Sequence, residues 1–238
     1  MASRAATQPR LESEGLKVLL LAAGAGRRLQ PLTLKTPKPL LSIGPERLIE
    51  RHLRRLRLAG FLEVVVNLYY LGHQIEAMLG DGRRFGLRIR YSHETHGLET
   101  GGGAKRALNL LGEAPFLMLS SDTVTDIDFA ELKCLAPSHA HLVLVPNPQH
   151  HSQGDFDLQS TGLVTPGTQL TFSGAAVINP TLMLAHPDTA FPMRDVLFPA
   201  ARQKLVSGQL FEGYWKDVGT EARLNEVRVD IDAGLCPY

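Results

Sequence analysis

The chain has 238 residues, of which 25 are Lys or Arg, 24 are Asp or Glu, and 44% are hydrophobic. This length allows one large α/β domain with a buried core and is short for two independent catalytic domains. The near balance of charge excludes the basic surface that nucleic-acid binding or a polybasic membrane contact requires. An anionic ligand must therefore be bound by a local group of residues.

The two cysteines, Cys134 and Cys236, lie far apart, and neither has the short spacing of a zinc site. Two free thiols agree with a reducing cytoplasm. The N-terminal residues contain no apolar signal segment, and the run Val18 to Ala23 is too short to cross a bilayer. We expect a cytoplasmic protein with a flexible tail over 1–16 and a single domain over 17–238.

The first half of the chain alternates short apolar runs with amphipathic segments. This alternation predicts a mostly parallel sheet with helices on both faces. The expected strands are Lys17 to Ala22, Glu63 to Asn67, Leu87 to Tyr91, Pro115 to Ser120 and His141 to Val145. The expected helices are Arg47 to Ala59, Leu71 to Leu79 and Gly103 to Leu111.

The pattern changes after Val145, where a polar stretch leads to two further apolar segments. Phe156 to Leu158 and Leu170 to Ile178 predict strands of an antiparallel excursion from the main sheet. We expect this second region to shape a pocket.

A glycine loop follows the first predicted strand in the sequence LAAGAGRRLQPLTLKTPKPL. The carboxyl edge of a parallel sheet is where such folds bind ligands, and Gly24 and Gly26 let backbone N–H groups approach phosphate oxygens. A dinucleotide fingerprint needs glycine at Leu29 and a P-loop needs Gly-Lys there, so neither motif is present. An ordinary strand-to-loop turn would also explain Gly-x-Gly alone.

Two cations accompany this loop, Arg28 and Lys38. They are placed to contact a triphosphate with their side chains while the glycines contact it with their backbone. Pro37 and Pro39 restrict the backbone on both sides of Lys38, so the lysine lies on a stiff segment. The combination favours phosphate binding over an ordinary turn.

Two aspartates are candidates for a metal site. Asp122 follows the predicted strand Pro115 to Ser120 at the same edge of the sheet, and Asp217 lies in YWKDVGT near the C-terminus. Carboxylates suit Mg²⁺, which prefers oxygen ligands and bridges the phosphates of a nucleotide. Either aspartate alone would also fit a solvated or helix-capping role, as we expect for Asp126 and Asp128.

The segments LAAGAGRRLQPLT and TPKPL together resemble the signature of the sugar-1-phosphate nucleotidyltransferases. The resemblance implies a glycosyltransferase-A-like, Rossmann-like α/β fold of three layers, with a mixed, mostly parallel sheet flanked by helices. It implies that Arg28 and Lys38 are catalytic and that Mg²⁺ is held by Asp122 and Asp217. It also assigns the nucleotide phosphates to the loop residues Ala23, Gly24, Ala25 and Gly26.

Further motifs extend the resemblance from Lys17 to about Glu226. GLETGGGAKRAL resembles the family's base-binding segment, which assigns Thr100, Gly101 and Gly102 to the nucleotide. Glu99 there replaces the usual glycine. The glycines would let the backbone approach a base or ribose closely, and the start of the helix would present free N–H groups. A capped helix after a glycine turn is the alternative.

Two glycines match positions where the family places backbone against the sugar phosphate, Gly154 in QGDFDL and Gly174 in LTFSG. Turn or bulge glycines are the alternative for both. Ser120 and Ser121 replace the family's usual Asn-Gly before the first aspartate. A serine Cβ at the glycine position would crowd the nucleotide or alter the last turn of the strand.

These motifs are most similar to the family branch that transfers uridylyl groups to N-acetylmuramate 1-phosphate in cell-wall recycling. The branch shortens the segment between Gly154 and Gly174, and this chain is short there too. The resemblance implies UTP and that sugar phosphate as partners, with a nucleotide sugar and pyrophosphate as products. A phosphate oxygen is the nucleophile, so no general base is required.

Several alternatives stay open at this point. One is a guanylyl-, uridylyl- or adenylyltransferase for mannose or glucose 1-phosphate, and another is a non-catalytic sugar-nucleotide sensor. We expect no nucleic-acid or membrane partner and a monomer or homodimer. We interpret His139, His141, His150 and His151 as solvated residues rather than metal ligands. The arginines of the helix Arg47 to Ala59 predict a solvated face or a subunit interface.

Overall fold

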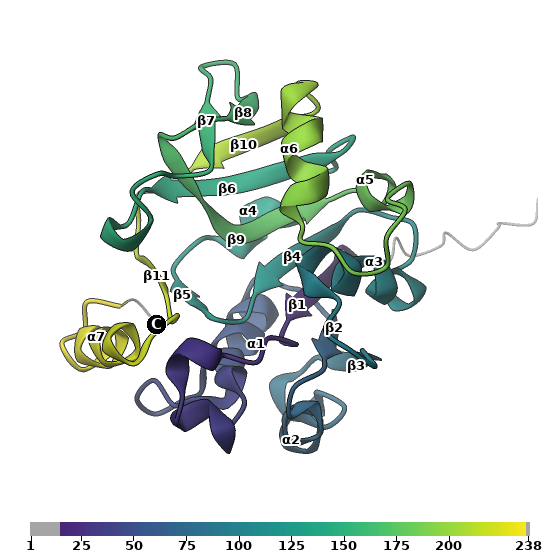
Figure 1. Ribbon diagram of the computed structural model, residues 1–238. Coiled ribbons are helices and arrows are strands. Elements are labelled where there is room, and N and C mark those ends of the chain that lie inside the picture. The colour runs from purple at the N-terminus through teal and green to yellow at the C-terminus, as the bar shows by residue number, and fades with distance from the viewer. Residues whose placement is uncertain (1–14, 237–238) are drawn as a thin grey trace, which may run out of the picture.

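The computed structural model describes residues 15–236, and its centre is a sheet with helices on both faces (Figure 1). The predicted tail over 1–16 lies outside the described residues except for Gly15 and Leu16. No helix in the described part of the chain is long and apolar enough to cross a membrane.

The main sheet has nine strands over the described residues, in the order β10-β6-β9-β4-β1-β2-β3, with β7 and β8 extending from β9. Within this order all neighbours are parallel except β9, which is antiparallel to both β4 and β6. The strands are β1 (Lys17–Leu21), β2 (Glu63–Leu68), β3 (Arg88–His93), β4 (Phe116–Ser120), β6 (Ala140–Pro146), β7 (Phe156–Leu158), β8 (Val164–Pro166), β9 (Leu170–Ile178) and β10 (Val206–Leu210).

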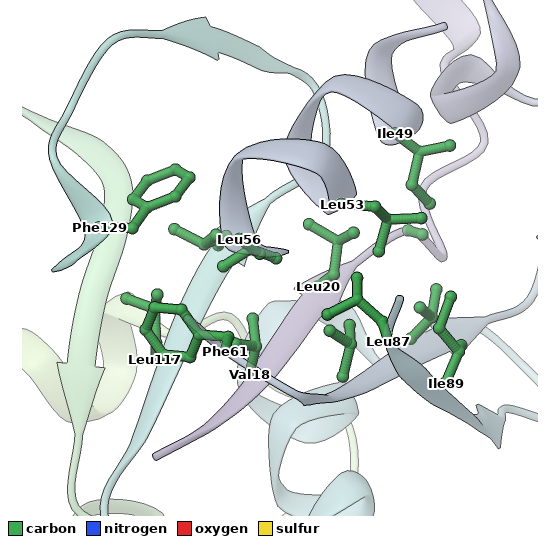
Figure 2. Close-up of a cluster of buried hydrophobic side chains, with 14 of the residues drawn as sticks. Val18, Leu20, Ile49, Leu53, Leu56, Phe61, Leu87, Ile89, Leu117 and Phe129 are labelled. Atoms are coloured by element: carbon green, nitrogen blue, oxygen red, sulfur yellow. The ribbon is translucent and has the colours of Figure 1, made fainter. Parts of the chain in front are cut away.

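One face of the sheet packs against α1 (Leu48–Leu58), α2 (Gly72–Leu79) and α4 (Phe129–Lys133). Side chains alternate between the two faces of a strand, so Val18 and Leu20 of β1 point to this face. Figure 2 shows them beside the apolar side of α1, formed by Ile49, Leu53 and Leu56. The amphipathic helix predicted over Arg47 to Ala59 is confirmed.

The opposite face packs against α3 (Glu99–Leu111), α5 (Thr181–Leu184) and α6 (Arg194–Arg202). Leu19 of β1 points to this side, where Ala104 and Ala107 allow α3 to lie close to the sheet. Strands that are buried on both faces need nearly continuous apolar sequence, which explains the run KVLLL in β1. The predicted three-layer α/β fold is confirmed.

A separate two-stranded ribbon joins β5 (Thr123–Thr125) and β11 (Trp215–Asp217) in antiparallel pairing. It packs with α7 (Glu221–Asp232) through Val124, Val218 and Leu224. Short 3-10 helices complete the described chain: η1 (Arg27–Leu29), η2 (Leu32–Leu34), η3 (Lys38–Leu40), η4 (Arg83–Phe85) and η5 (Gln149–His151). The ribbon brings the end of β4 and the C-terminal region together.

Two predictions about the elements are corrected. The segment Leu170–Ile178 is not an excursion, because β9 lies inside the main sheet between β4 and β6 and only β7 and β8 extend from it. The third predicted helix begins at Glu99 rather than at Gly103. Glycine lowers helix propensity, but packing against the rest of the protein compensates for it here.

The arginines of α1 do not all form a solvated face. Arg51 is buried and donates to Oε1 of Glu46 over 3.1 Å. Arg55 donates to the carbonyl oxygens of Thr125 and Ile127, the latter over 2.8 Å. The prediction is therefore wrong for these two residues, because an arginine stem can lie on apolar surface while its head group binds backbone carbonyls.

Candidate active site

Two pockets adjoin at the carboxyl ends of β1 and β4, the edge that the sequence indicated. The first pocket, of about 400 Å³, contains the glycine loop, and the second, of about 960 Å³, lies beside β9 and the start of α6. They share the lining residues Leu21, Glu99, Thr100, Ser120 and Asp122. The pockets are thus two parts of one cleft, with room for two ligands that meet near Asp122.

The glycine loop lines the first pocket with Ala23, Gly24 and Ala25. A Cβ added to Gly24 would meet no atom within 4 Å, so the surrounding protein leaves space at this position. Gly26 does not line either pocket and has φ +60°, and an added Cβ would lie 2.9 Å from Cγ2 of Thr33. Gly26 is therefore required by the turn itself.

Three cations surround this loop. Arg28 lines the second pocket and has no hydrogen bond or ion pair to any other described residue. Arg27, which the sequence analysis did not select, lines the first pocket together with Lys38. The two adjacent arginines of η1 thus line different pockets of the cleft, Arg27 the first and Arg28 the second.

Lys38 is paired with Asp122. Its amine donates to Oδ2 of the aspartate, and the lysine side chain is 11% exposed. Asp122 lines both pockets, so this ion pair lies where the pockets meet. Oδ1 of Asp122 has no hydrogen bond or ion pair within residues 15–236.

The β5–β11 ribbon places Asp217 next to Asp122. Asp217 pairs in register with Thr123, and the N–H of Val218 donates to the carbonyl oxygen of Asp122 over 2.8 Å. Oδ1 of Asp217 accepts from Arg223 over 2.6 Å and lies 2.9 Å from Nε2 of His150. Both aspartates line the second pocket.

These carboxylates fit the preferences of Mg²⁺. Each uses one oxygen for a basic side chain, and the other oxygen has no partner among the described residues. Mg²⁺ takes oxygen ligands and commonly uses one or two carboxylates together with substrate phosphates. The described chain contains no group of three or more His, Cys, Asp or Glu residues suited to a metal.

Ser120 and Ser121 are accommodated without blocking the cleft. The hydroxyl of Ser121 donates to the carbonyl oxygen of Leu21 over 2.5 Å, so it is directed to β1. Ser120 lies against Gly174, which has φ +85° and whose added Cβ would be 2.7 Å from Oγ of Ser120. Gly174, a predicted sugar-side residue, lines the second pocket and leaves space for this serine.

The segment Thr100 to Gly102 differs from the expectation of free helix N–H groups. Only Thr100 lines the pockets. The N–H groups of Gly101 and Gly102 both donate to the carbonyl oxygen of Phe191, over 2.9 and 3.0 Å. An added Cβ on Gly102 would be 2.2 Å from the carbonyl oxygen of Thr189, so these glycines allow the segment before α6 to pack on α3.

A buried polar network, which was not predicted from the sequence, lies beside the first pocket. Oδ1 of Asn67 accepts from the N–H of Ala22 over 2.7 Å, and its amide donates to Glu94 over 2.8 Å. The other oxygen of Glu94 accepts from the N–H of Leu98 over 3.0 Å, and burial raises the pKa of Glu94. A polar residue at the end of the β2 sequence was the available signal for Asn67.

The second pocket has histidines on its rim. His150 contacts Asp217, and His151 lies 3.1 Å from Oδ1 of Asp155. Each of these two histidines, which the sequence predicts to be solvated, therefore has a carboxylate neighbour, on β11 for His150 and in the turn before β7 for His151. Gly154, the other predicted sugar-side residue, does not line this pocket; its φ is +58°, and an added Cβ would be 2.8 Å from the carbonyl oxygen of Thr168.

Comparisons with known proteins show the family to which the chain belongs. Residues 17–162 match the family model described as nucleotidyl transferase. The chain is 46% identical over 224 residues to N-acetylmuramate alpha-1-phosphate uridylyltransferase of Neisseria meningitidis serogroup B, which covers 90% of this chain and 97% of that protein. It is 33% identical over 234 residues to the protein of the same name from Caulobacter vibrioides, covering 87% and 96% of the two chains.

A solved structure with the same fold is a putative glucose-1-phosphate thymidylyltransferase from Bacillus anthracis. Its TM-score is 0.80 at 17% identity, over 90% of this chain and 94% of that chain. At this identity the similarity concerns the fold. Together with the family match and the long alignments above, it means that the chain belongs to the nucleotidyl transferase family, in its sugar-1-phosphate nucleotidyltransferase group, and is an enzyme of this type.

Proposed function

We propose that the protein transfers a uridylyl group from UTP to N-acetylmuramate 1-phosphate, giving a nucleotide sugar and pyrophosphate. The observation that carries this proposal is the meeting of two pockets at Asp122, with basic residues on both sides. The names of the two long relatives supply the sugar and the nucleotide. The larger second pocket provides room for a sugar with a bulky substituent.

In this assignment the nucleotide lies in the first pocket and the sugar phosphate in the second. Ala23, Gly24 and Ala25 bind the phosphates through backbone N–H groups, as open glycine loops do. Thr100 lies between the two ligands. Gly174 leaves space on the sugar side, whereas Gly154 acts through the turn that carries Asp155 into the pocket.

The reaction needs positioning and charge neutralisation more than proton transfer. An oxygen of the sugar phosphate attacks the α-phosphorus, and the bond from that phosphorus to the β-phosphate oxygen breaks, so that pyrophosphate leaves with the electron pair. The attacking phosphate is largely ionised near neutral pH because its second pKa is about 6. Lys38 and Arg28 then stabilise charge that develops on the phosphate oxygens.

Asp122 and Asp217 would hold Mg²⁺ through the oxygens that have no partner among residues 15–236. When bound, Mg²⁺ supplies charge neutralisation on the nucleotide phosphates. Arg223 and His150 fix the other oxygen of Asp217 and so orient its carboxylate. The cytoplasmic location, the place in peptidoglycan recycling, the single domain and the monomer or homodimer state stay predictions.

The test is pyrophosphate release with Mg²⁺ from each of the four ribonucleoside triphosphates paired with N-acetylmuramate, N-acetylglucosamine, glucose or mannose 1-phosphate. We expect UTP with N-acetylmuramate 1-phosphate to have the highest kcat/KM. Another best pair would replace the proposed substrates by those of a different sugar-1-phosphate nucleotidyltransferase. Nucleotide binding without release from any pair would favour the sensor.

A further inference from the structure

Glu99, at the start of α3, has an unusual backbone conformation. Its φ is +63°, and among the described non-glycine residues only Leu71 and Lys204 also have positive φ. This left-handed region is unfavourable for a side chain because Cβ approaches the following carbonyl oxygen. Of the three residues, only Glu99 lines the two pockets.

The backbone on both sides of Glu99 is fixed by hydrogen bonds. The N–H of Leu98 donates to Glu94 over 3.0 Å, and the carbonyl oxygen of Leu98 accepts from Phe191 over 3.1 Å. Oγ1 of Thr100 accepts from the N–H of Met193 over 2.8 Å. Backbone strain persists where its surroundings impose it, and such positions cluster at functional sites.

The side chain of Glu99 is placed to contact ligands. It is exposed and lines both pockets, as Asp122 does. Its carboxylate has no hydrogen bond or ion pair within residues 15–236. An ionised carboxylate accepts hydrogen bonds and cannot donate them. It would also repel a phosphate group beside it, because both groups are negatively charged. Neutral hydroxyl donors are therefore the groups that suit this position.

We propose that the Glu99 carboxylate binds hydroxyl groups of a substrate sugar ring where the two pockets meet, and so contributes to substrate specificity. The inference rests on the proposed function, because that function places two sugar rings, the ribose and the hexose, beside this junction. Both rings offer the same hydroxyl chemistry. The experiment distinguishes them by presenting each ring separately.

The test is isothermal titration calorimetry in the presence of Mg²⁺, with each ligand titrated alone so that no turnover occurs. The ligands are UTP, 2′-deoxy-UTP, 3′-deoxy-UTP and N-acetylmuramate 1-phosphate, and the proteins are the wild type, Glu99→Gln and Glu99→Gly. Loss of a hydrogen bond to a charged group weakens binding about tenfold or more. If the ribose is bound, the variants bind UTP about tenfold more weakly and no longer distinguish it from at least one deoxy analogue.

If the hexose is bound, the variants lose about tenfold in affinity for N-acetylmuramate 1-phosphate and keep the wild-type affinity for UTP. Either result supports the inference. Two matched controls lie outside the pockets. Lys204→Gly makes the same backbone change at φ +59°, and Glu221→Gln removes an exposed carboxylate from the first residue of α7. Both should bind all ligands as the wild type does.

Thermal unfolding shows whether the variants are folded. Glycine accepts positive φ without strain, so Glu99→Gly and Lys204→Gly should both keep the wild-type Tm within a few degrees. Wild-type affinities for every ligand in folded Glu99 variants would overturn the inference while leaving the proposed function intact. If the wild type itself binds neither UTP nor N-acetylmuramate 1-phosphate, the proposed function and the inference both fail.

Discussion

The amine of Lys38 donates to Oδ2 of Asp122, so the residue assigned to phosphate binding is paired directly with a residue assigned to metal binding. The lysine follows the glycine loop and the aspartate follows β4, 84 positions further along the chain. Because both lie where the two pockets meet, the same lysine that neutralises Asp122 is within the region where substrate phosphates are expected. In the proposed metal site the lysine and the metal ion would contact different oxygens of this carboxylate, so their like charges would repel each other.

Removal of this lysine should separate metal binding from catalysis. We expect Lys38→Met to lower kcat by about 10²-fold or more, as loss of one charged stabilising group does. The same variant should bind Mn²⁺ about fivefold more tightly without nucleotide, since repulsion of about 1 kcal/mol by the lysine charge is lost. Electron paramagnetic resonance of free Mn²⁺ measures this affinity.

Lys35→Met is the matched control. Lys35 is exposed and lies outside both pockets, and the substitution removes the same charge. It should change neither kcat nor the Mn²⁺ affinity. Weaker Mn²⁺ binding by Lys38→Met than by the wild type would contradict charge repulsion between Lys38 and a metal ion at Asp122.

Gly219 provides space for the arginine that orients Asp217. A Cβ added to Gly219 would lie 2.1 Å from Nη2 of Arg223 and 3.0 Å from Oδ2 of Asp217. The guanidinium can move away, so Gly219→Ala should fold with little change in Tm and lose about tenfold in kcat/KM. Steady-state kinetics and thermal unfolding together check this expectation.

A double variant shows whether Gly219→Ala lowers activity by displacing Arg223 or by another effect on the site. If the alanine acts by displacing Arg223, then Gly219→Ala with Arg223→Gln should be no less active than the worse single variant. Multiplicative losses would show that Gly219 acts independently of Arg223. Arg228→Gln, on a half-buried position of the same helix outside both pockets, should have wild-type kinetics.

The contact of Gly174 with Ser120 predicts a coupled effect on stability. Gly174→Ala combines unfavourable φ with a Cβ that would be 2.7 Å from Oγ of Ser120. We expect a loss of about 2–4 kcal/mol in the free energy of unfolding. Ser120→Gly should restore only the part that arises from the contact, about 1 kcal/mol or more, because the φ of residue 174 is unchanged.

Urea unfolding of the two single variants and the double variant measures this coupling. If the changes in the free energy of unfolding are additive, contact with Ser120 does not explain why residue 174 is a glycine. Activity of Ser120→Gly then shows separately whether the serine itself matters for turnover.

His52 predicts a loss of stability in acid. Burial is the largest cause that lowers its pKa from 6.5 to about 4, while Nε2 lies 2.8 Å from the carbonyl oxygen of Thr123. The folded protein therefore favours neutral histidine, and the unfolded chain binds more protons between these values. Neutral His52 contributes fully to the free energy of unfolding above pH 6.5. This contribution, about 3 kcal/mol at most, is lost as the pH falls towards 4.

Free energies of unfolding at pH 7 and pH 4.5 test this sign. His52→Gln keeps a hydrogen-bond donor but cannot titrate, so its stability should fall less than that of the wild type between the two values. His73→Gln, on an exposed position of α2, should behave like the wild type. An equal acid loss in His52→Gln would rule out a role for His52.

The three-layer fold, most strand positions and the place of the glycine loop could be predicted from the sequence alone. These features depend on local rules: apolar runs such as KVLLL form buried strands, and glycines and prolines restrict the backbone around Arg28 and Lys38. The family motifs then selected Asp122 and Asp217. The positions of individual site residues could be predicted because these residues lie at the ends of predicted strands or in loops rich in glycine and proline.

Which of these groups lie next to one another depends on the packing of distant segments. Asp122 and Asp217 become neighbours through the pairing of β5 with β11, which neither sequence pattern specifies. Gly101 and Gly102 are covered because the segment before α6 packs on α3, although their sequence looks like an open loop. Contacts between distant segments depend on the packing of the whole chain, so local patterns do not determine them.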